Sequence, residues 1–192
     1  MPRVKTVSKK QAIVDAASRD FAEKDFHEVL IDDIATSAKI GKGTIYRYFE
    51  TKEELYFAAI LQGFDELYET LVATLPEEAS PARRLERIAR EILQFFWRRR
   101  YLLTLLSNDE RFAAHETELA RRRERVNTLV QQAILDGIAS NEFRGVDARV
   151  AAELFRGMIR AANCFRREED TLEDLVSQIV GIFTAGIARR TA

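Results

Sequence analysis

The chain has 192 residues, a formal net charge of −1, and 46 % apolar and 32 % charged residues. This composition is typical of a globular protein, and it excludes a disordered chain or one with a basic field over its whole surface. One cysteine and two histidines exclude a Cys/His zinc cluster, and no apolar run is long enough to span a bilayer.

Apolar residues recur at helical spacing along the chain, and no alternating strands joined by hairpin dipeptides are visible. The basic start MPRVKTVSKK is not followed by an apolar run, so we expect no signal peptide and a cytoplasmic protein. Two capping boxes, SKKQ and TKEE, mark the starts of two helices. We predict N-terminal helices over residues 8 to about 25, 31–38, 43–49 and 51–73.

The clearest break is LPEEASPARR, where Ser80 is the expected N-cap and Pro81 the first position of the next helix. No proline follows Pro81, so a long C-terminal region is free of helix breakers. We expect helices there over about 81–98, 101–106, 116–139, 148–166 and 172–189. The prediction is an all-α chain of about nine helices, in which a three-helix helix-turn-helix domain precedes a C-terminal helical domain.

The last two helices are apolar over more than one stripe, and such helices must bury two faces. One face is expected to pack on the core of the chain, and the other on a second copy of the chain. The predicted interface of this homodimer comprises Leu154, Met158, Ile179, Ile182, Phe183 and Ile187.

The stretch IGKGTIYRYFETKEELY contains a glycine pair that could either cradle a phosphate or open a helix. A P-loop requires Gly-x-x-x-x-Gly-Lys-Ser/Thr after a strand, whereas the order here is Gly41-Lys42-Gly43-Thr44 with no strand before it. A dinucleotide-binding fingerprint would need a third glycine where Tyr46 stands. The pattern therefore favours a helix start.

A helix that begins at this glycine pair has one face suited to the major groove of a duplex. At about 100° per residue, Ile45 and Phe49 share the buried face, and Arg47 points directly away from it. Arginine can bond guanine O6 and N7 together, and hydroxyl groups can hold phosphates. Four Lys/Arg and one acid lie between Lys39 and Lys52, so this helix is locally basic.

The alternative is a solvated helix face whose tyrosines cover the core. For any one of these residues alone, that simpler interpretation is the better one. The whole set, in this order after a tight turn, favours nucleic-acid recognition.

The segment IDDIATSAKIGKGTIYRYFETKEELYFAAI resembles the DNA-binding domain of TetR/AcrR-family transcriptional regulators. The matching signature is Ile-Ala, a few residues, and then Lys-Gly-Thr-Ile-Tyr-x-Tyr-Phe-x-x-Lys-Glu-x-Leu. The rest of the chain resembles the family in length and helical layout. The resemblance implies a helix-turn-helix DNA-binding domain over residues 1–54 and a ligand-binding and dimerisation domain over residues 55–192.

In that family the first domain binds operator DNA, and the second dimerises and holds an inducer. The resemblance implies phosphate contacts at Thr44, Tyr46, Tyr48 and Lys52, and base-facing positions at Gly43 and Arg47. With Lys42, these seven residues are the candidate DNA contacts.

The segment also departs from the family pattern. Leu30 stands where the family often has a threonine that caps the second helix, so this side-chain cap and its phosphate contact are in question. Lys39 and Gly41 replace the more usual glycine and serine in the turn. Gly41 can still serve as an N-cap, and Lys39 is a possible further phosphate contact.

The same resemblance gives candidates for lining an inducer pocket, each of which has ordinary core or surface as its alternative. They are Trp97, Tyr101, Asn108, Asn127, Asn163 and Cys164. Cys164 is interpreted as a buried small side chain rather than a sensor thiol. The arginine runs at 98–100 and 121–125 could bind an anionic ligand, although charge runs on helices are usually solvated faces.

No Ser/His/Asp or Cys/His set points to catalysis, so we expect neither an enzyme nor a cofactor or metal site. The preferred function is a ligand-responsive repressor that a small-molecule inducer releases from a palindromic operator. The alternatives are an activator of the same fold and a helical ligand-binding or interaction module without DNA binding. The expected partners are double-stranded operator DNA, a second copy of the chain and an unknown small-molecule inducer, with no membrane.

Overall fold

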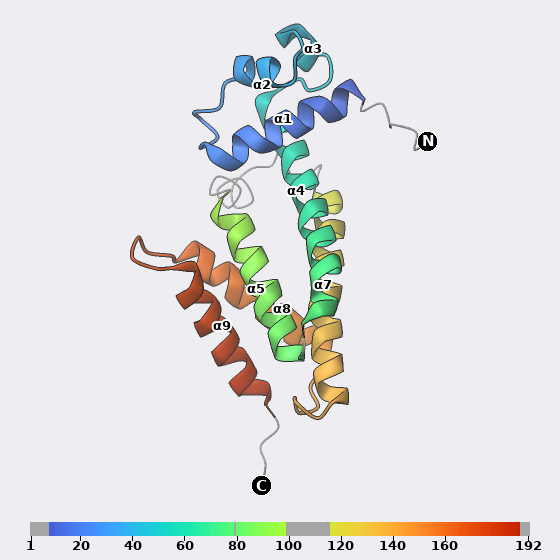
Figure 1. The fold of residues 1–192 in the computed structure, drawn as a ribbon, viewed down its shortest axis with the longest axis vertical. Coiled ribbons are helices and arrows are strands. Elements are labelled where there is room, and N and C mark those ends of the chain that lie inside the picture. The colour runs from blue at the N-terminus through green and yellow to red at the C-terminus, as the bar shows by residue number, and fades with distance from the viewer. Residues whose placement is uncertain (1–7, 79, 99–115, 189–192) are drawn as a thin grey trace.

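The computed structural model describes residues 8–78, 80–98 and 116–188, and the regular elements within these ranges are helices (Figure 1). They are α1 (Lys9–Glu23), α2 (Ile31–Ser37), α3 (Lys42–Tyr46), α4 (Lys52–Thr74), the 3₁₀ helix η1 (Leu75–Glu77), α5 (Pro81–Trp97), α7 (Glu116–Ala139), α8 (Ala148–Cys164) and α9 (Leu172–Ile187). One isolated β-bridge joins Phe143 to Ala188. The all-α prediction is confirmed, and the short helix expected over 101–106 lies outside the described residues.

Three helices have a side-chain N-cap at the residue where the sequence pattern predicts one. Ser8, Thr51 and Ser80 each accept a hydrogen bond from the backbone N–H three residues later, at 3.2, 3.1 and 3.3 Å. A cap of this kind stabilises a helix by about 1 kcal/mol. Helix α2 has Leu30 at its N-cap and makes no side-chain cap there, which agrees with the departure seen in the sequence.

Helices α1, α2 and α3 and the first turns of α4 form a small head around a cluster of aromatic rings. The ring centroids of Phe21 and Tyr56 lie 4.7 Å apart, and those of Phe26 and Tyr56 lie 5.1 Å apart. Ile45 and Phe49, which were predicted to share the buried face, are 1 % and 5 % exposed. This packing seats one side of α3 on the head and leaves its other side to solvent.

Helix α3 is shorter than predicted: it ends at Tyr46 rather than near Phe49. The N–H groups of Tyr48 and Phe49 both bond to the carbonyl of Ile45, at 2.9 and 3.0 Å, so the last turn tightens. Arg47 still has helical backbone angles as the C-cap residue, and its side chain is exposed.

Helix α4 leaves the head and runs through the body beside α5 and α7 (Figure 1). Against α5, the ring centroid of Phe64 lies 4.7 Å from that of Phe95 and 6.2 Å from that of Phe96. Helix α5 also packs on α9, and α7 packs on α8. One continuous helix therefore belongs both to the head and to the core of the body.

A close contact shapes the C-terminal end of α7. Asn141 has a left-handed φ of 61°, and the N–H of Phe143 bonds to the carbonyl of Gly137 at 2.9 Å. The ring of Phe143 lies so near Gly137 that a Cβ at this position would be 2.1 Å from a ring carbon. A glycine is required here because the ring occupies the space of a side chain.

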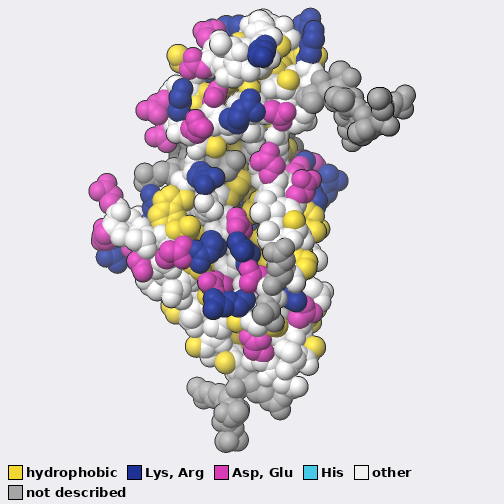
Figure 2. Space-filling model, in the orientation of Figure 1, with side chains coloured by type: hydrophobic (Ala, Val, Ile, Leu, Met, Phe, Trp, Pro, Cys, Tyr) yellow, Lys and Arg dark blue, Asp and Glu magenta, His cyan; other side chains and the backbone are white. Residues whose placement is uncertain are grey.

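Positive and negative side chains are mixed over the visible surface, and Lys and Arg side chains also lie at the free end of the head (Figure 2). Within 8–78, 80–98 and 116–188, no helix is long and apolar enough to cross a membrane. In the same ranges, no group of three or more His, Cys, Asp or Glu side chains is arranged to hold a metal ion.

Candidate nucleic-acid interface

The turn between α2 and α3 sets how α3 stands on the head. Lys39 has a left-handed φ of 56°, and its N–H bonds to the carbonyl of Thr36 at 3.1 Å. The N–H of Ile40 bonds to the carbonyl of Ala35 at 3.0 Å. Gly41 is the N-cap of α3 and has a φ of −77°, which any residue can adopt. The strained position of this turn is therefore occupied by a lysine and not by the glycine.

The side of α3 that faces away from the core is open. Tyr46 at the end of α3 is 46 % exposed, Arg47 and Tyr48 in the turn that follows are exposed, Tyr48 by 39 %, and Thr44 within α3 is half-buried. No atom lies within 4 Å of the position that a Cβ on Gly43 would occupy. The structure thus brings the α3 residues predicted from the sequence onto the free end of the head (Figure 1).

Three cations of the head lie over aromatic rings. They are Lys10 at 5.5 Å from the ring centroid of Phe49, Arg47 at 5.9 Å from that of Tyr48, and Lys52 at 4.4 Å from that of Phe26. Burial lowers the pKa of Lys52, and the neighbouring Glu53 partly offsets this effect. A ring orients a cation without cancelling its charge, so these side chains stay available to an anion.

Lys42, at the start of α3, is held by a carboxylate instead. Its Nζ lies 3.0 Å from Oδ2 of Asp32 in the first turn of α2, and the two side chains are 50 % and 65 % exposed. The hydrogen bond to Asp32 and the Coulomb attraction between the two groups raise the pKa of Lys42. The adjacent Asp33 forms a separate ion pair, at 3.7 Å, with Lys24, the C-cap residue of α1.

This arrangement can bind a polyanion through its backbone and read the edge of a base. The major groove of B-DNA, about 12 Å wide, admits an α-helix. An exposed arginine on such a helix can donate two hydrogen bonds to one guanine. Lysine, threonine and tyrosine side chains beside it suit phosphate oxygens, which position the helix without reading sequence.

The candidates for lining an inducer pocket do not form one cluster. The guanidinium of Arg166 lies 4.0 Å from the ring centroid of Trp97, so the end of α5 is near the end of α8. Asn163 donates to the carbonyl of Ile159 at 3.2 Å, within its own helix. Cys164 is exposed, so its predicted burial is wrong. It is the last residue of α8, where the chain passes into an exposed link.

Asn127 lies apart from these residues, buried on α7. Its Nδ2 donates to Glu153 on α8 at 2.9 Å, and its Oδ1 is buried without a hydrogen-bond partner among the described residues. At about 1.5 Å per residue, Glu153 and Asn163 are separated by about 15 Å along α8. The remaining candidates, Tyr101 and Asn108, lie outside the described residues.

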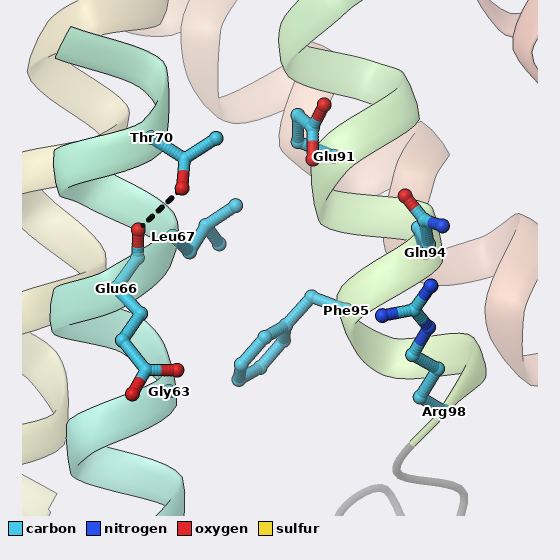
Figure 3. Close-up of a pocket in the computed structure, with 8 residues that line it drawn as sticks. All are labelled: Gly63, Glu66, Leu67, Thr70, Glu91, Gln94, Phe95 and Arg98. Carbon is cyan, nitrogen blue, oxygen red and sulfur yellow. Dashed lines mark hydrogen bonds between the residues drawn. The ribbon is translucent and has the colours of Figure 1, made fainter. Parts of the chain in front are cut away.

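A polar groove of about 160 Å³ lies between α4 and α5 (Figure 3). Phe95 points from α5 towards α4, and Glu66, Glu91 and Arg98 lie around it. Only Arg98 was noted in the sequence, because which side chains meet between α4 and α5 depends on how the two helices are rotated against each other. Drug-sized ligands need about 300–1,000 Å³, so this space suits only a small group or part of a larger ligand.

The six residues predicted at a dimer interface divide between two faces. Leu154 and Ile182 are 63 % and 66 % exposed, and Met158 is half-buried. The other three, which are buried in the core of the protomer, are Ile179, Phe183 and Ile187. The physical reason is that α9 turns this stripe inward, where the ring centroid of Phe183 lies 4.7 Å from that of Phe155.

Two arginines of the run at 121–125 tie α7 to α4. Arg122 Nε and an Arg125 guanidinium nitrogen lie 3.0 and 2.8 Å from the carboxylate of Asp65. The guanidinium of Arg125 also lies 4.0 Å from the ring centroid of Tyr68. These two arginines are more than a solvated charged face, because they join the body to the helix that leaves the head.

Asp32 and Phe26 take part in the candidate interface but were not recognised from the sequence. Asp32 reaches Lys42 across the turn, and Phe26 reaches Lys52 from the link before α2. Neither pair has helical spacing, so periodicity gives no signal for them. The residue types alone, an acid and a lysine on either side of a tight turn, were the available hint.

Two family models match the chain. The model described as "Bacterial regulatory proteins, tetR family" matches residues 13–59, and the one described as "Tetracyclin repressor-like, C-terminal domain" matches residues 78–187. The HTH-type transcriptional regulator YhgD of Bacillus subtilis (strain 168) is 28 % identical over 159 residues, which cover 77 % of this chain and 78 % of the relative. The Fatty acid metabolism regulator protein of the same organism is 27 % identical over 161 residues, 77 % of each chain.

Solved structures show the same fold. A transcriptional regulator of the TetR/AcrR family from Thermobifida fusca YX-ER1 has a TM-score of 0.73 and 26 % identity, covering 94 % of this chain and 99 % of that one. FadR from Bacillus subtilis in complex with stearoyl-CoA has a TM-score of 0.69 and 22 % identity, covering 92 % of this chain and 98 % of that one. At this identity, the second likeness concerns the fold alone.

Proposed function

Because this chain belongs to the tetR family of bacterial regulatory proteins, we propose that it is a transcriptional repressor that a small molecule releases from a palindromic operator. The observation that carries the proposal is the open face of α3. Arg47, Tyr46 and Tyr48 are exposed there, and Gly43 leaves the backbone accessible. A helical module without DNA binding would have no need for this combination.

In the proposed complex, α3 enters the major groove of duplex DNA. Arg47 bonds the edge of a guanine, and Gly43 allows the backbone to approach the groove. The phosphates on either side are held by side chains that carry hydroxyl groups or positive charge. These are Lys42, Thr44, Tyr46, Tyr48 and Lys52.

The proposed functional unit is a homodimer built on the outward faces of α8 and α9. Leu154, Met158 and Ile182 supply its apolar centre, since Leu154 and Ile182 have little cover within the protomer. A two-fold dimer presents two copies of α3 to the DNA. Its operator is therefore a pseudo-palindrome whose half-sites lie about one helical turn apart, or a multiple of it.

We assign residues 1–54 to the DNA-binding domain and residues 55–192 to the ligand-binding and dimerisation domain. Helix α4 begins at Lys52 and so connects the two. A ligand bound among α4, α5 and α7 would shift α4. In the dimer this shift would change the distance between the two copies of the head, and so between the two α3 helices. By linkage, the ligand must then bind less tightly to the DNA-bound form, by the same factor by which it weakens operator binding.

The first ligand class to test is a long-chain acyl-CoA. Two similar proteins are described as a fatty acid metabolism regulator and as FadR in complex with stearoyl-CoA. In this chain, the rings of Phe64, Phe95 and Phe96 pack together between α4 and α5, so an acyl chain would have to displace them in order to lie between the two helices. Arg98 lies at the end of α5 and offers a positive charge for a phosphate group.

The test begins by selecting the operator from random duplexes and measuring its binding by fluorescence anisotropy. We expect a pseudo-palindromic site and an affinity that falls as salt rises, because phosphates are neutralised. An asymmetric or single-stranded target would contradict the DNA-binding proposal. Stearoyl-CoA should then weaken operator binding, with free CoA as the matched control. If operator affinity is unchanged at saturating stearoyl-CoA, the ligand class is wrong while the DNA-binding proposal stands.

A further inference from the structure

The candidate DNA contacts Lys42, Arg47 and Lys52, and Lys10 beside Phe49, each have a defined partner, and one of the four differs from the rest. Lys10, Arg47 and Lys52 lie over aromatic rings. Lys42 instead bonds the carboxylate of Asp32 at 3.0 Å. The partner is thus neutral in three cases and carries a full negative charge in the fourth.

This difference matters for binding to DNA. A cation over a ring keeps its full charge and can turn to a phosphate without losing an ion pair. A phosphate that approaches Lys42 must displace the Asp32 carboxylate or share the ammonium group with it. This competition reduces what Lys42 contributes to binding.

The Asp32–Lys42 pair is open enough to be exchanged. The two side chains are 50 % and 65 % exposed, so water reaches both groups and no core packing locks them together. Ion pairs of this kind are weak and are screened by salt. A phosphate can therefore compete for Lys42, and Asp32 sets how strongly it must compete.

We propose that Asp32 is a positioning residue that acts as a built-in counterion for Lys42 and lowers the affinity of the protein for every duplex. This inference rests on the proposed binding of DNA by α3. Phosphates are present in all sequences, so the effect is the same on operator and non-operator DNA. Arg47, over the neutral ring of Tyr48, is outside this control.

The experiment measures dissociation constants of the full-length protein for operator and scrambled duplexes over a range of salt. Asp32→Asn should tighten binding to both duplexes by about two- to fivefold per half-site, the range of a weak surface ion pair. In a Lys42→Gln background, Asp32→Asn should change nothing. Asp32→Glu, which keeps the carboxylate, should bind like the original protein.

Asp33→Asn is the matched control, because it removes the same charge one residue away but breaks a pair with Lys24 of α1. Its effect should be smaller than that of Asp32→Asn and equal with and without Lys42. Asp32→Asn and Asp33→Asn each remove a negative charge from the first turn of α2, so thermal unfolding should be lowered slightly and by a similar amount in both. The inference is overturned if Asp32→Asn gives no gain, or if its gain persists in the Lys42→Gln background, since the carboxylate would then act on DNA directly. If the original protein binds no duplex at all, the proposed function itself fails.

Discussion

Lys39 and Asn141 are the two non-glycine residues with positive φ in the described ranges, at 56° and 61°. Each follows the end of a helix, where a left-handed residue lets the chain reverse. Asparagine tolerates this conformation because its short polar side chain bonds locally, whereas lysine has no such compensation. The backbone strain of the head is therefore concentrated in the turn that orients α3.

Lys39→Gly should raise the free energy of unfolding by about 0.5–1 kcal/mol, because glycine adopts positive φ without a steric penalty. Urea unfolding at a fixed protomer concentration measures this. Asn141→Gly is the matched control and should give a smaller gain. A loss of stability in Lys39→Gly would show that its side chain makes a contact worth more than the strain.

Asp20 is expected to make the free energy of unfolding depend on pH. Burial raises its pKa above the ordinary 3.8, and Lys24 only partly offsets this. One of its carboxylate oxygens, Oδ2, is buried without a hydrogen-bond partner among the described residues. A carboxyl whose pKa rises on folding binds its proton more tightly in the folded state, so ionisation penalises folding above that raised pKa.

Asp20→Asn should therefore raise the free energy of unfolding at pH 7, and its advantage should shrink as pH falls through the raised pKa towards 3.8. Asp15→Ala is the contrasting variant, because it removes the Oδ1 that accepts hydrogen bonds from Gln11 and Gln62, both at 2.9 Å. It should destabilise. Unfolding curves at several pH values measure both, and a gain for Asp20→Asn that does not vary with pH would contradict the account.

Among the helices, starts were easier to predict than ends and faces. The caps at Ser8, Thr51 and Ser80 involve partners three residues away, so the sequence shows them directly. The end of α3 depends on how Phe49 packs into the head, and this is a tertiary contact. The inward and outward stripes of α9 are both apolar, so the sequence could not decide which one holds Phe183 and which one holds Ile182.

The C-terminal end of α7 depends on the close contact between Gly137 and the ring of Phe143. Gly137→Ala should cost about 1–3 kcal/mol, because its Cβ would overlap the Phe143 ring. Gly43→Ala is the control, since no atom lies within 4 Å of its Cβ position. It should leave stability unchanged or raise it by up to about 1 kcal/mol. Equal losses in thermal unfolding for the two variants would contradict the packing described for α7.

In the proposed dimer, one apolar face of α8 and α9 packs in the core of the protomer and the other faces the second copy of the chain. Ile182→Glu leaves the protomer core intact, because Ile182 is 66 % exposed. In a dimer it would bury an unpaired charge, so association should weaken by about 3–5 kcal/mol. Val72→Glu, at an exposed apolar site on α4, is the control and should not change association. Sedimentation equilibrium measures both, and an unchanged dimer in Ile182→Glu would place the interface elsewhere.

The candidate DNA contacts were predictable because they lie close together in the chain, on one short helix and the start of the next. The residues that line a space for a ligand were not predictable, because they depend on how the helices pack against one another. Asn127 and Asn163 proved to lie far apart on the body, and the groove at Phe95 forms between α4 and α5. Periodicity identifies which residues are buried on each helix but not which buried residues meet.

The proposed reading of DNA by Arg47 is tested by measuring the affinity of the protein for operator and scrambled duplexes at several salt concentrations. Arg47→Ala should cost about 1–3 kcal/mol on the operator and little on scrambled DNA. Lys52→Ala should weaken both duplexes alike and lower the salt slope by about one per half-site. If Arg47→Ala loses affinity equally on both duplexes, arginine holds phosphate and the base-reading role is wrong. If neither variant changes binding, α3 is not the recognition helix.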